Sequence, residues 1–392
     1  MRRGLAALGA AVVLVGTLAG CTDDGTAPTA AEPSSSPTEQ PSSPAETEAT
    51  ESAEPTDGTE TSENEGALEG GTAESPAPVE PSMNLLNWSR VPGPATATAT
   101  RSGPWTLSIA EGGSRATLQG PGGSETFVAD SRKRISDGLI DGDWAAVVFQ
   151  DEQETQPAIA QIVQLGVKGG DFTVDGSSKV PTTTGGTWAL GDGTLVHPTI
   201  GPGASYCLAT VDLEKHTSER TWCAEKRHGF NAAQVTPEAT SLMTFDDQQP
   251  SCRTVAQVTG EDVVPFEGVE KCLGWEGVLL DGGAVWSVVP KQNRIEEARY
   301  YARSGDEYFG LGPGTSGTLA WCGGAAYFSQ DPLRDGDPAR LLRWTADGTL
   351  EVVYETRGRG PAFLTEPRCG GDRITVTAIA ESGDQQVSAP VG

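Results

Sequence analysis

Apolar residues between positions 83 and 392 fall into short runs that predict β-strands. Most of these runs are bounded by Gly, Pro or Asp, the residues that end strands and form turns. Asp347-Gly348 separates the runs 341–344 and 350–354, as expected of a hairpin turn. Only residues 293–303 have a pattern that fits a short helix. The part from 83 to 392 is therefore predicted to be all-β, with further strands at 105–110, 144–149, 195–200, 241–245, 285–289, 326–329 and 374–379.

These strands recur at a regular spacing. From residue 144 onward their starts lie 51, 46, 44, 41 and 48 residues apart, and several follow a glycine turn. A period of about 40 to 50 residues with several strands in each is typical of a β-propeller. The pattern resembles propellers of the WD40/TolB-like class, without their repeated Gly-His and Trp-Asp pairs. Seven blades result if the strand at 105 begins a repeat, and six if it does not.

The ends of the ring need closing, because an open edge strand invites aggregation. The last repeat is incomplete after Pro390, and we expect a segment around residues 84–100 to complete it. The rival architecture is a pair of β-sandwich domains, which predicts no single period across the whole block.

The first 20 residues have the pattern of a secretory signal peptide. Arg2 and Arg3 precede an uncharged run, 4–20, which ends in Leu18-Ala19-Gly20-Cys21. This ending resembles the lipobox of bacterial lipoproteins. The resemblance implies cleavage before Cys21, a lipid (palmitate) on that cysteine, and a lipid anchor on the extracytoplasmic face of the cell membrane. The alternative is a transmembrane anchor, for which a run of 17 residues is marginal.

Residues 21–82 have the composition of a disordered linker. Positions 22–82 hold 15 acidic residues, no Lys, no Arg and no aromatic residue. Such a chain buries too little apolar surface to offset its conformational entropy. We expect a spacer, and its Ser, Thr and Pro content also fits a glycosylated segment or one that threads a cell wall.

The charge and composition restrict the partners and the source. The part from 83 to 392 has 25 basic and 39 acidic residues, which disfavours nucleic acid as a partner. Abundant Ala, Gly, Thr and Arg with few Lys indicate a high-GC Gram-positive, actinobacterial-type source.

Six cysteines remain after Cys21, and an even number in an exported chain indicates disulfides. Six cysteines allow 15 pairings, and hairpin symmetry favours one of them. Cys207 and Cys223, like Cys252 and Cys272, flank a turn, so each pair can face across two strands of one blade. Cys322 and Cys369 each precede Gly-Gly in successive repeats, so they can join neighbouring blades. A zinc site is disfavoured, because there is no Cys-x-x-Cys and there are only three histidines.

No motif for catalysis, nucleotide binding or metal binding stands out. The nucleophile elbow, the phosphate-binding loop, the dinucleotide fingerprint and His-Glu-x-x-His are all absent from the sequence. We expect His197, His216 and His228 to be packed or solvated. The Asp-Gly-Asp sequences at 141–143 and 335–337 are expected to be turns rather than calcium ligands. The sequence therefore predicts no cofactor, no metal and no catalytic residue.

The leading functional prediction is a monomeric, membrane-anchored binding or scaffolding module at the cell envelope. Its partner would be an envelope protein or a glycan. The alternative is a hydrolase or lyase that acts on envelope carbohydrate with carboxylates at the channel mouth. Inward Asp, Glu or His side chains around an open pocket would favour the enzyme, and a filled channel would favour the binding module.

Overall fold

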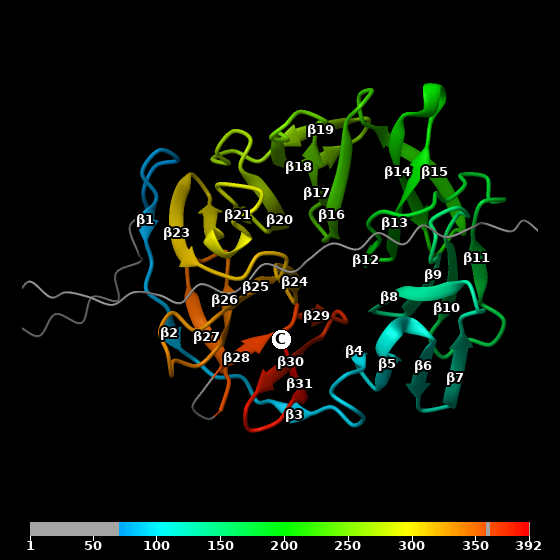
Figure 1. Ribbon diagram of the computed structural model, residues 1–392, viewed down its shortest axis with the longest axis horizontal. Helices are drawn as coiled ribbons and strands as arrows, with labels where there is room; N and C mark the ends of the chain where they lie inside the picture. Colours follow the sequence, from blue (N-terminus) through cyan, green and yellow to red (C-terminus); the bar gives the residue numbers. More distant parts are fainter. Residues whose placement is uncertain (1–69, 358–360, 392) are drawn as a thin grey trace, which may run out of the picture. The chain divides into compact units, whose positions relative to one another are not determined.

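The computed structural model describes residues 70–357 and 361–391, which form seven sheets around a central channel (Figure 1). Each sheet is one blade, and the chain runs through each blade from the channel outward. The predicted β-propeller is confirmed with seven blades, and the strand at residue 105 does belong to a repeat of its own. The predicted signal peptide, Cys21 and the predicted linker up to residue 69 lie outside the described residues. Within the described ranges no helix is long and apolar enough to cross a membrane.

The first four blades each contain four strands, which follow one another from the channel outward. Blade 1 consists of β4 (Thr98–Ser102), β5 (Trp105–Ile109), β6 (Arg115–Gly120) and β7 (Gly123–Val128). Blade 2 consists of β8 (Lys133–Asp141), β9 (Trp144–Asp151), β10 (Ile159–Gln164) and β11 (Phe172–Val174). Blade 3 consists of β12 (Ala189–Gly191), β13 (Thr194–Ile200), β14 (Tyr206–Asp212) and β15 (Thr217–Cys223). Blade 4 consists of β16 (Gly229–Val235), β17 (Thr240–Phe245), β18 (Arg253–Thr259) and β19 (Asp262–Pro265).

The last three blades each gain an outermost strand from the N-terminal side of the propeller. Blade 5 consists of β20 (Gly274–Leu280), β21 (Gly283–Val288), β22 (Arg299–Ser304), β23 (Glu307–Pro313) and β1 (Ala77–Pro78). Blade 6 consists of β24 (Ala320–Cys322), β25 (Ala325–Gln330), β26 (Arg340–Trp344), β27 (Leu350–Glu355) and β2 (Ser82–Met83). Blade 7 consists of β28 (Ala362–Leu364) and β29 (Arg368–Cys369) on the channel, then β30 (Arg373–Ala380), β31 (Gln385–Pro390) and β3 (Ser89–Arg90).

The strands that the sequence revealed most clearly are the second strands of the blades. β9, β21 and β25 are buried along nearly their whole length, because a neighbouring blade covers each face. A strand covered on both faces is a continuous apolar run rather than an alternating one. The outermost strand β7, by contrast, is exposed at five of its six positions. This gradient of burial explains why the apolar runs recur once per blade.

A strap of residues 71–91 closes the ring. β1 and β2 pair in parallel with β23 and β27, and β3 pairs antiparallel with β31. The predicted closure by the segment around 84–100 is confirmed, because β3 is the fourth strand of blade 7. The pairing begins earlier in the chain than residue 83, since Gly71 already forms a bridge with Tyr308. Part of the segment assigned to the linker, from residue 70 to 82, thus lies on the propeller.

Residues 293–303, whose sequence pattern fits a short helix, do not form one. The segment forms a single 3-10 turn, η3 (Ile295–Glu297), and then the strand β22. The alternation of buried and exposed side chains in β22 places Tyr300 and Ala302 in the core, so tertiary packing overrides the local helical pattern. Two other 3-10 turns are present, η1 (Glu111–Gly113) and η2 (Pro202–Ala204).

The six cysteines form three disulfides in the pairs favoured by the sequence. Cys207–Cys223 joins β14 to β15, and Cys322–Cys369 joins the inner strands of blades 6 and 7. The Cys252–Cys272 pair is also present, but its placement differs from the prediction. β19 ends at Pro265, so Cys272 lies beyond blade 4, where the next residue pairs in parallel with Arg253. That disulfide therefore ties blade 4 to the segment leading into blade 5.

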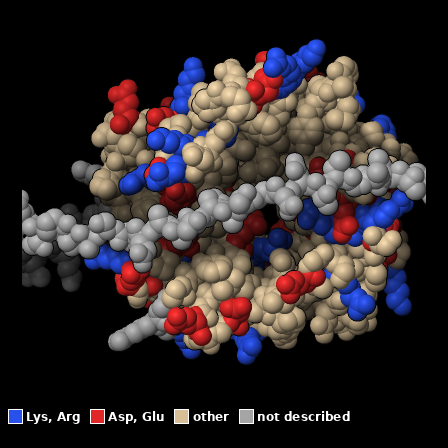
Figure 2. Space-filling view, in the orientation of Figure 1, with Lys and Arg blue, Asp and Glu red and all other residues tan. Residues whose placement is uncertain are grey.

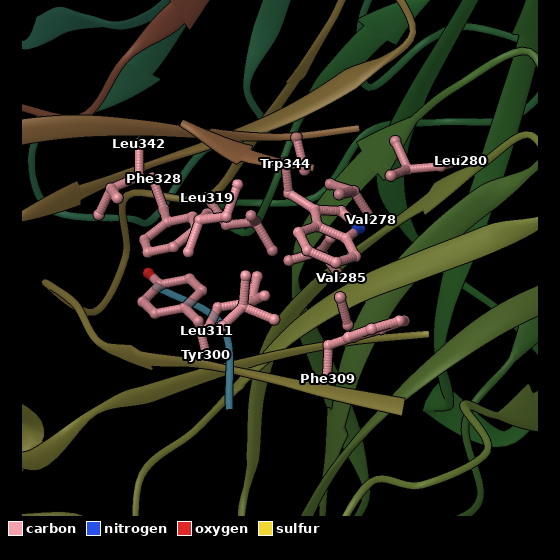
Figure 3. Packing of buried hydrophobic residues seen from close by; sticks show 14 of the residues in the cluster. Val278, Leu280, Val285, Tyr300, Phe309, Leu311, Leu319, Phe328, Leu342 and Trp344 are labelled. Atoms are coloured by element: carbon pink, nitrogen blue, oxygen red, sulfur yellow. The ribbon is translucent and has the colours of Figure 1, made fainter. Parts of the chain in front are cut away.

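The packing between blades 5 and 6 shows how neighbouring blades are held together (Figure 3). Tyr300 of blade 5 stacks on Phe328 of blade 6, with ring centroids 4.1 Å apart. Phe309 of blade 5 contacts Trp344 of blade 6 in a tilted arrangement, with a centroid distance of 5.1 Å. Aromatic pairs of this kind contribute about 0.5–1.5 kcal/mol each beyond the area that they bury.

A buried carboxyl group also fastens blade 5 to blade 6. Glu276, only 5% exposed, accepts hydrogen bonds from the hydroxyls of Tyr300 (2.6 Å) and Ser287 (3.2 Å). It also accepts hydrogen bonds from the backbone N–H groups of Gly317 (3.0 Å) and Leu319 (3.1 Å), which lie between the two blades. Burial raises the pKa of Glu276, although these four donors oppose the shift.

Near the channel, glycine is required where inner strands approach one another. A Cβ atom on Gly191 of β12 would lie 2.5 Å from the carbonyl oxygen of Val235 in β16. We predict that Gly191→Ala lowers the free energy of unfolding by about 1–3 kcal/mol, because the two blades must move apart. Gly122 is the matched control, since a Cβ there meets nothing within 4 Å. Urea unfolding of both variants is the measurement, and equal stabilities for the two would contradict the prediction.

The pH dependence of stability tests the state of Glu276. A carboxyl whose pKa is raised in the folded state stabilises the protein at low pH, and this stabilisation is lost as the pH rises through that pKa. Glu276→Gln keeps the side chain neutral at every pH, at the expense of the acceptor for the Leu319 N–H. We expect the free energy of unfolding of the variant, minus that of the unsubstituted protein, to increase by roughly 1–3 kcal/mol between pH 4 and pH 8. A difference that is constant over this range would show that folding does not raise the pKa of this carboxyl.

Candidate functional site

The central channel contains a cavity of about 370 Å³. All seven inner strands, or the residues directly beside them, contribute to its wall. Figure 2 shows both acidic and basic side chains inside the central hollow. A cavity of this size can hold a small organic molecule. The channel is therefore open rather than filled with side chains.

Bulges in the inner strands shape the channel wall. The register shifts between Ile135 and Asp137 in β8, between Asn231 and Gln234 in β16, and between Gly274 and Glu276 in β20. A bulge adds one residue to a strand and re-aims its side chains, and bulges are common beside functional sites. Asp137, Gln234 and Glu276 belong to the channel lining.

The inner strand of blade 7 is also irregular, because it is interrupted between β28 and β29. β28 ends at Leu364 and β29 begins at Arg368, so three residues lie between the two strands. Leu364 is opposite Ala378 and Arg368 is opposite Thr375, which leaves one extra residue on the channel side. Pro367 has no N–H for the ladder, and this accounts for the break. The interruption places Glu366 and Arg368 on the channel wall.

Asp137, Glu366 and Arg368 form a charged cluster on one side of the channel. Their strands belong to blades 2 and 7, and between them blade 1 presents only the small Thr100 to the channel. Burial raises the pKa of Asp137, and the positive charges of Arg368 and Arg134 oppose this shift. The pKa of Glu366 is raised by its enclosure and by the negative charge of Asp137, while Arg368 lowers it. The Glu366 side chain is 54% accessible to water, so solvent screens much of this effect.

Asp141 is a further acidic group at the channel, but it serves the fold. Its Oδ2 accepts a hydrogen bond from the backbone N–H of Asp192 (3.1 Å), which joins the inner turns of blades 2 and 3. Asp372 does the same for Gly103 (2.8 Å) and joins blades 7 and 1. Asp141 is the last residue of β8, and Gly142 and Asp143 form the turn into β9, as expected of the Asp-Gly-Asp sequence at 141–143. In the described ranges, no group of three or more His, Cys, Asp or Glu side chains could hold a metal ion.

The histidines do not belong to the charged cluster. His197 is fully buried in β13, stacks on Trp188 (centroids 5.1 Å apart), and burial lowers its pKa. His216 stacks on Phe172 at the surface, and His228 is exposed. The packed and solvated positions expected for the three histidines are confirmed.

The channel residues Asp137, Glu366 and Arg368 were not identified from the sequence. Two local signals could have pointed to them. Ser136-Asp137-Gly138 interrupts an apolar alternation within a strand, and Pro367 interrupts the first strand of the last repeat. Each signal marks an irregular strand, which is where bulges occur.

No family model and no curated protein matches this sequence. Among solved structures, the chain is similar to the β-propeller domain of the Trilobed protease from Pyrococcus furiosus, with a TM-score of 0.51 and 10% identity over 78% of this chain and 96% of that domain. A prolyl endopeptidase matches with a TM-score of 0.47 and 12% identity over 78% of this chain, which spans 47% of that protein. TolB from Acinetobacter baumannii matches with a TM-score of 0.37 and 12% identity, over 75% of this chain and 79% of TolB. At these identities the likeness concerns the fold alone, which is a seven-bladed β-propeller.

Proposed function

We propose that this protein is an exported lipoprotein, anchored through Cys21 on the extracytoplasmic face of the cell membrane, whose propeller binds a partner at its central channel. An open channel with inward acidic side chains is the arrangement that we expected of the enzyme, so openness alone does not favour binding. The observation that carries the binding role is the pair of Glu366 and Arg368 on the channel wall. Both side chains are charged and only loosely paired, with 3.9 Å between Arg368 Nη2 and Glu366 Oε2. Charged side chains that line a cavity and lack close partners keep hydrogen-bonding capacity for a ligand.

The contrast with Glu276 supports this assignment. Glu276 accepts four hydrogen bonds, and its surroundings satisfy the carboxyl group completely. The side chains of Glu366 and Arg368, by contrast, form no hydrogen bond with any other group of residues 70–357 and 361–391, and contact each other only in a distant ion pair. The first arrangement is structural, whereas the second leaves hydrogen-bonding capacity for a partner.

A second candidate function is a hydrolase or lyase that acts on envelope carbohydrate. The observation in its favour is that Asp137 and Glu366 face the same channel and both have a raised pKa. A carboxyl group with a raised pKa suits general acid–base catalysis near neutral pH. Cleavage of a glycan fragment by the unsubstituted protein and not by the Glu366→Gln variant would favour the enzyme.

The membrane address is tested by fatty-acid labelling. We expect palmitate to label the full-length protein in its native cells, and Cys21→Ala to abolish the labelling. Changing one of the six other cysteines together with its disulfide partner, for example Cys207 and Cys223 to Ser, should leave the labelling intact. Label that persists in Cys21→Ala would disprove the anchor.

The binding surface is tested by photo-crosslinking in live cells. Phe363 lies on β28 three residues before Glu366 and is 48% exposed. Val264, on the outermost strand of blade 4, is 45% exposed and serves as the matched control. With benzoylphenylalanine at each position in turn, we expect adducts from position 363 and none from 264. Adducts from position 264 alone, or from neither position, would refute a partner at the channel.

A further inference from the structure

A side pocket of about 340 Å³ lies between blades 7 and 1 and shares its wall with the channel. Glu366 and Arg368 line both cavities, so the charged cluster stands where they meet. Most of the other side chains around the pocket are short and polar. They include Thr96 and Thr98 from the chain entering blade 1, and Thr365, Thr375, Thr377 and Gln386 from blade 7.

Hydrogen bonds fix the wall of this pocket, and one buried hydroxyl in the wall has no partner. Gln386 Nε2 donates hydrogen bonds to the Thr377 hydroxyl (2.9 Å) and to the carbonyl oxygen of Ala97 (3.0 Å), which fixes the wall across the two blades. Thr375 is 1% exposed, and its hydroxyl has no hydrogen-bond partner among the described residues. A buried hydroxyl without a partner costs about 1–3 kcal/mol, so Thr375 points to a polar molecule in the pocket.

The two charged groups at the junction also lack close hydrogen-bond partners. In blade 6, Arg343 donates to Glu351 through both Nε and Nη2, which is a completed pair. Arg368 and Glu366 make a single contact at 3.9 Å, near the limit for an ion pair. The guanidinium therefore keeps donors for a carboxylate, and the Glu366 carboxylate keeps acceptors for an ammonium group.

These groups match a zwitterion. A free α-amino acid carries one carboxylate and one ammonium group close together, as Arg368 and Glu366 require. Asp137 adds a second negative charge whose effect reaches Glu366. Arg134 partly offsets Asp137 but lines neither cavity, so the cluster presents one more acid than base to the channel. An amino acid with a second amine on its side chain balances that excess.

We propose that the junction of the channel and the side pocket binds a free diamino acid of the lysine type. Its carboxylate pairs with Arg368, its α-ammonium group with Glu366, and Thr375 donates or accepts a further hydrogen bond. The second ammonium group lies in the field of Asp137. This inference rests on the proposed binding role of the channel and names the class of its ligand.

Calorimetric titration of the full chain in detergent tests the proposal with L-lysine as the probe. Cadaverine is lysine without the carboxylate, and aminocaproate is lysine without the α-ammonium group. We expect both analogues to bind about 10- to 100-fold more weakly than lysine, as expected for the loss of one charge-assisted hydrogen-bonded contact. Glucosamine, a cationic sugar of similar size, is expected not to compete.

Variants of the site test which charge of lysine each side chain binds. In Arg368→Gln, lysine should bind no better than cadaverine, and in Glu366→Gln, no better than aminocaproate. Thr375→Val should weaken lysine binding about tenfold without lowering the unfolding temperature, since it removes an unpaired buried hydroxyl. Arg294→Gln is the control, because Arg294 forms an ion pair with Glu296 far from the channel strands and should not affect binding.

The outcomes separate this inference from the function on which it rests. Equal binding of lysine and cadaverine, competition by glucosamine, or no lysine binding by a chain that still crosslinks at position 363 would overturn the ligand class and leave the binding role standing. Absence of both lysine binding and crosslinks at 363 would overturn the two together. Unchanged lysine affinity in Arg368→Gln would also refute the proposed site.

Discussion

Closure of the ring at blade 7 is the constraint on which the rest of the structure depends. β31 would be an open edge at the end of the chain if β3 did not pair with it. The Cys322–Cys369 disulfide reinforces the same joint from the channel side. With both in place, the seven inner strands are held at fixed distances around the channel. The positions of the channel side chains follow from that closure, and so does the close approach of Gly191 to β16.

The buried polar groups of this propeller fall into two classes with different physical roles. In the first class, every donor and acceptor is used, as in Glu276 and in the turns where Asp141 and Asp372 join successive blades. In the second class, buried polar atoms have no hydrogen-bond partner among the described residues, and these atoms are spread around the ring, for example on Arg101, Trp344 and Thr375. Satisfied groups add rigidity and unsatisfied groups reduce stability. What distinguishes the meeting of blades 7 and 1 is the loose pair of Glu366 and Arg368, which lines two cavities.

The sequence predicts the fold well and the candidate site poorly, for one physical reason. The second strand of each blade, such as β9, is covered on both faces by the neighbouring blades. Its position is therefore visible in the sequence as a local apolar run. The cysteine pairs follow the same repeat and are equally visible. Glu366 and Asp137 owe their position to bulges in the inner strands, and a bulge depends on pairing between strands rather than on composition. In the sequence both residues resemble ordinary loop acids, because the ring that encloses them forms only on folding.

The strap also determines how the molecule carries mechanical load. Any pull on the chain ahead of Gly70 first meets the pairing of Gly71 and β1 with blade 5, and then that of β2 with blade 6. Only after both have peeled away does tension reach β3 and the joint of blade 7. The three pairings therefore break one after another, and the outer two must break before the ring is loaded. Under such a pull the outer strands of the ring detach first, while the central channel keeps its shape.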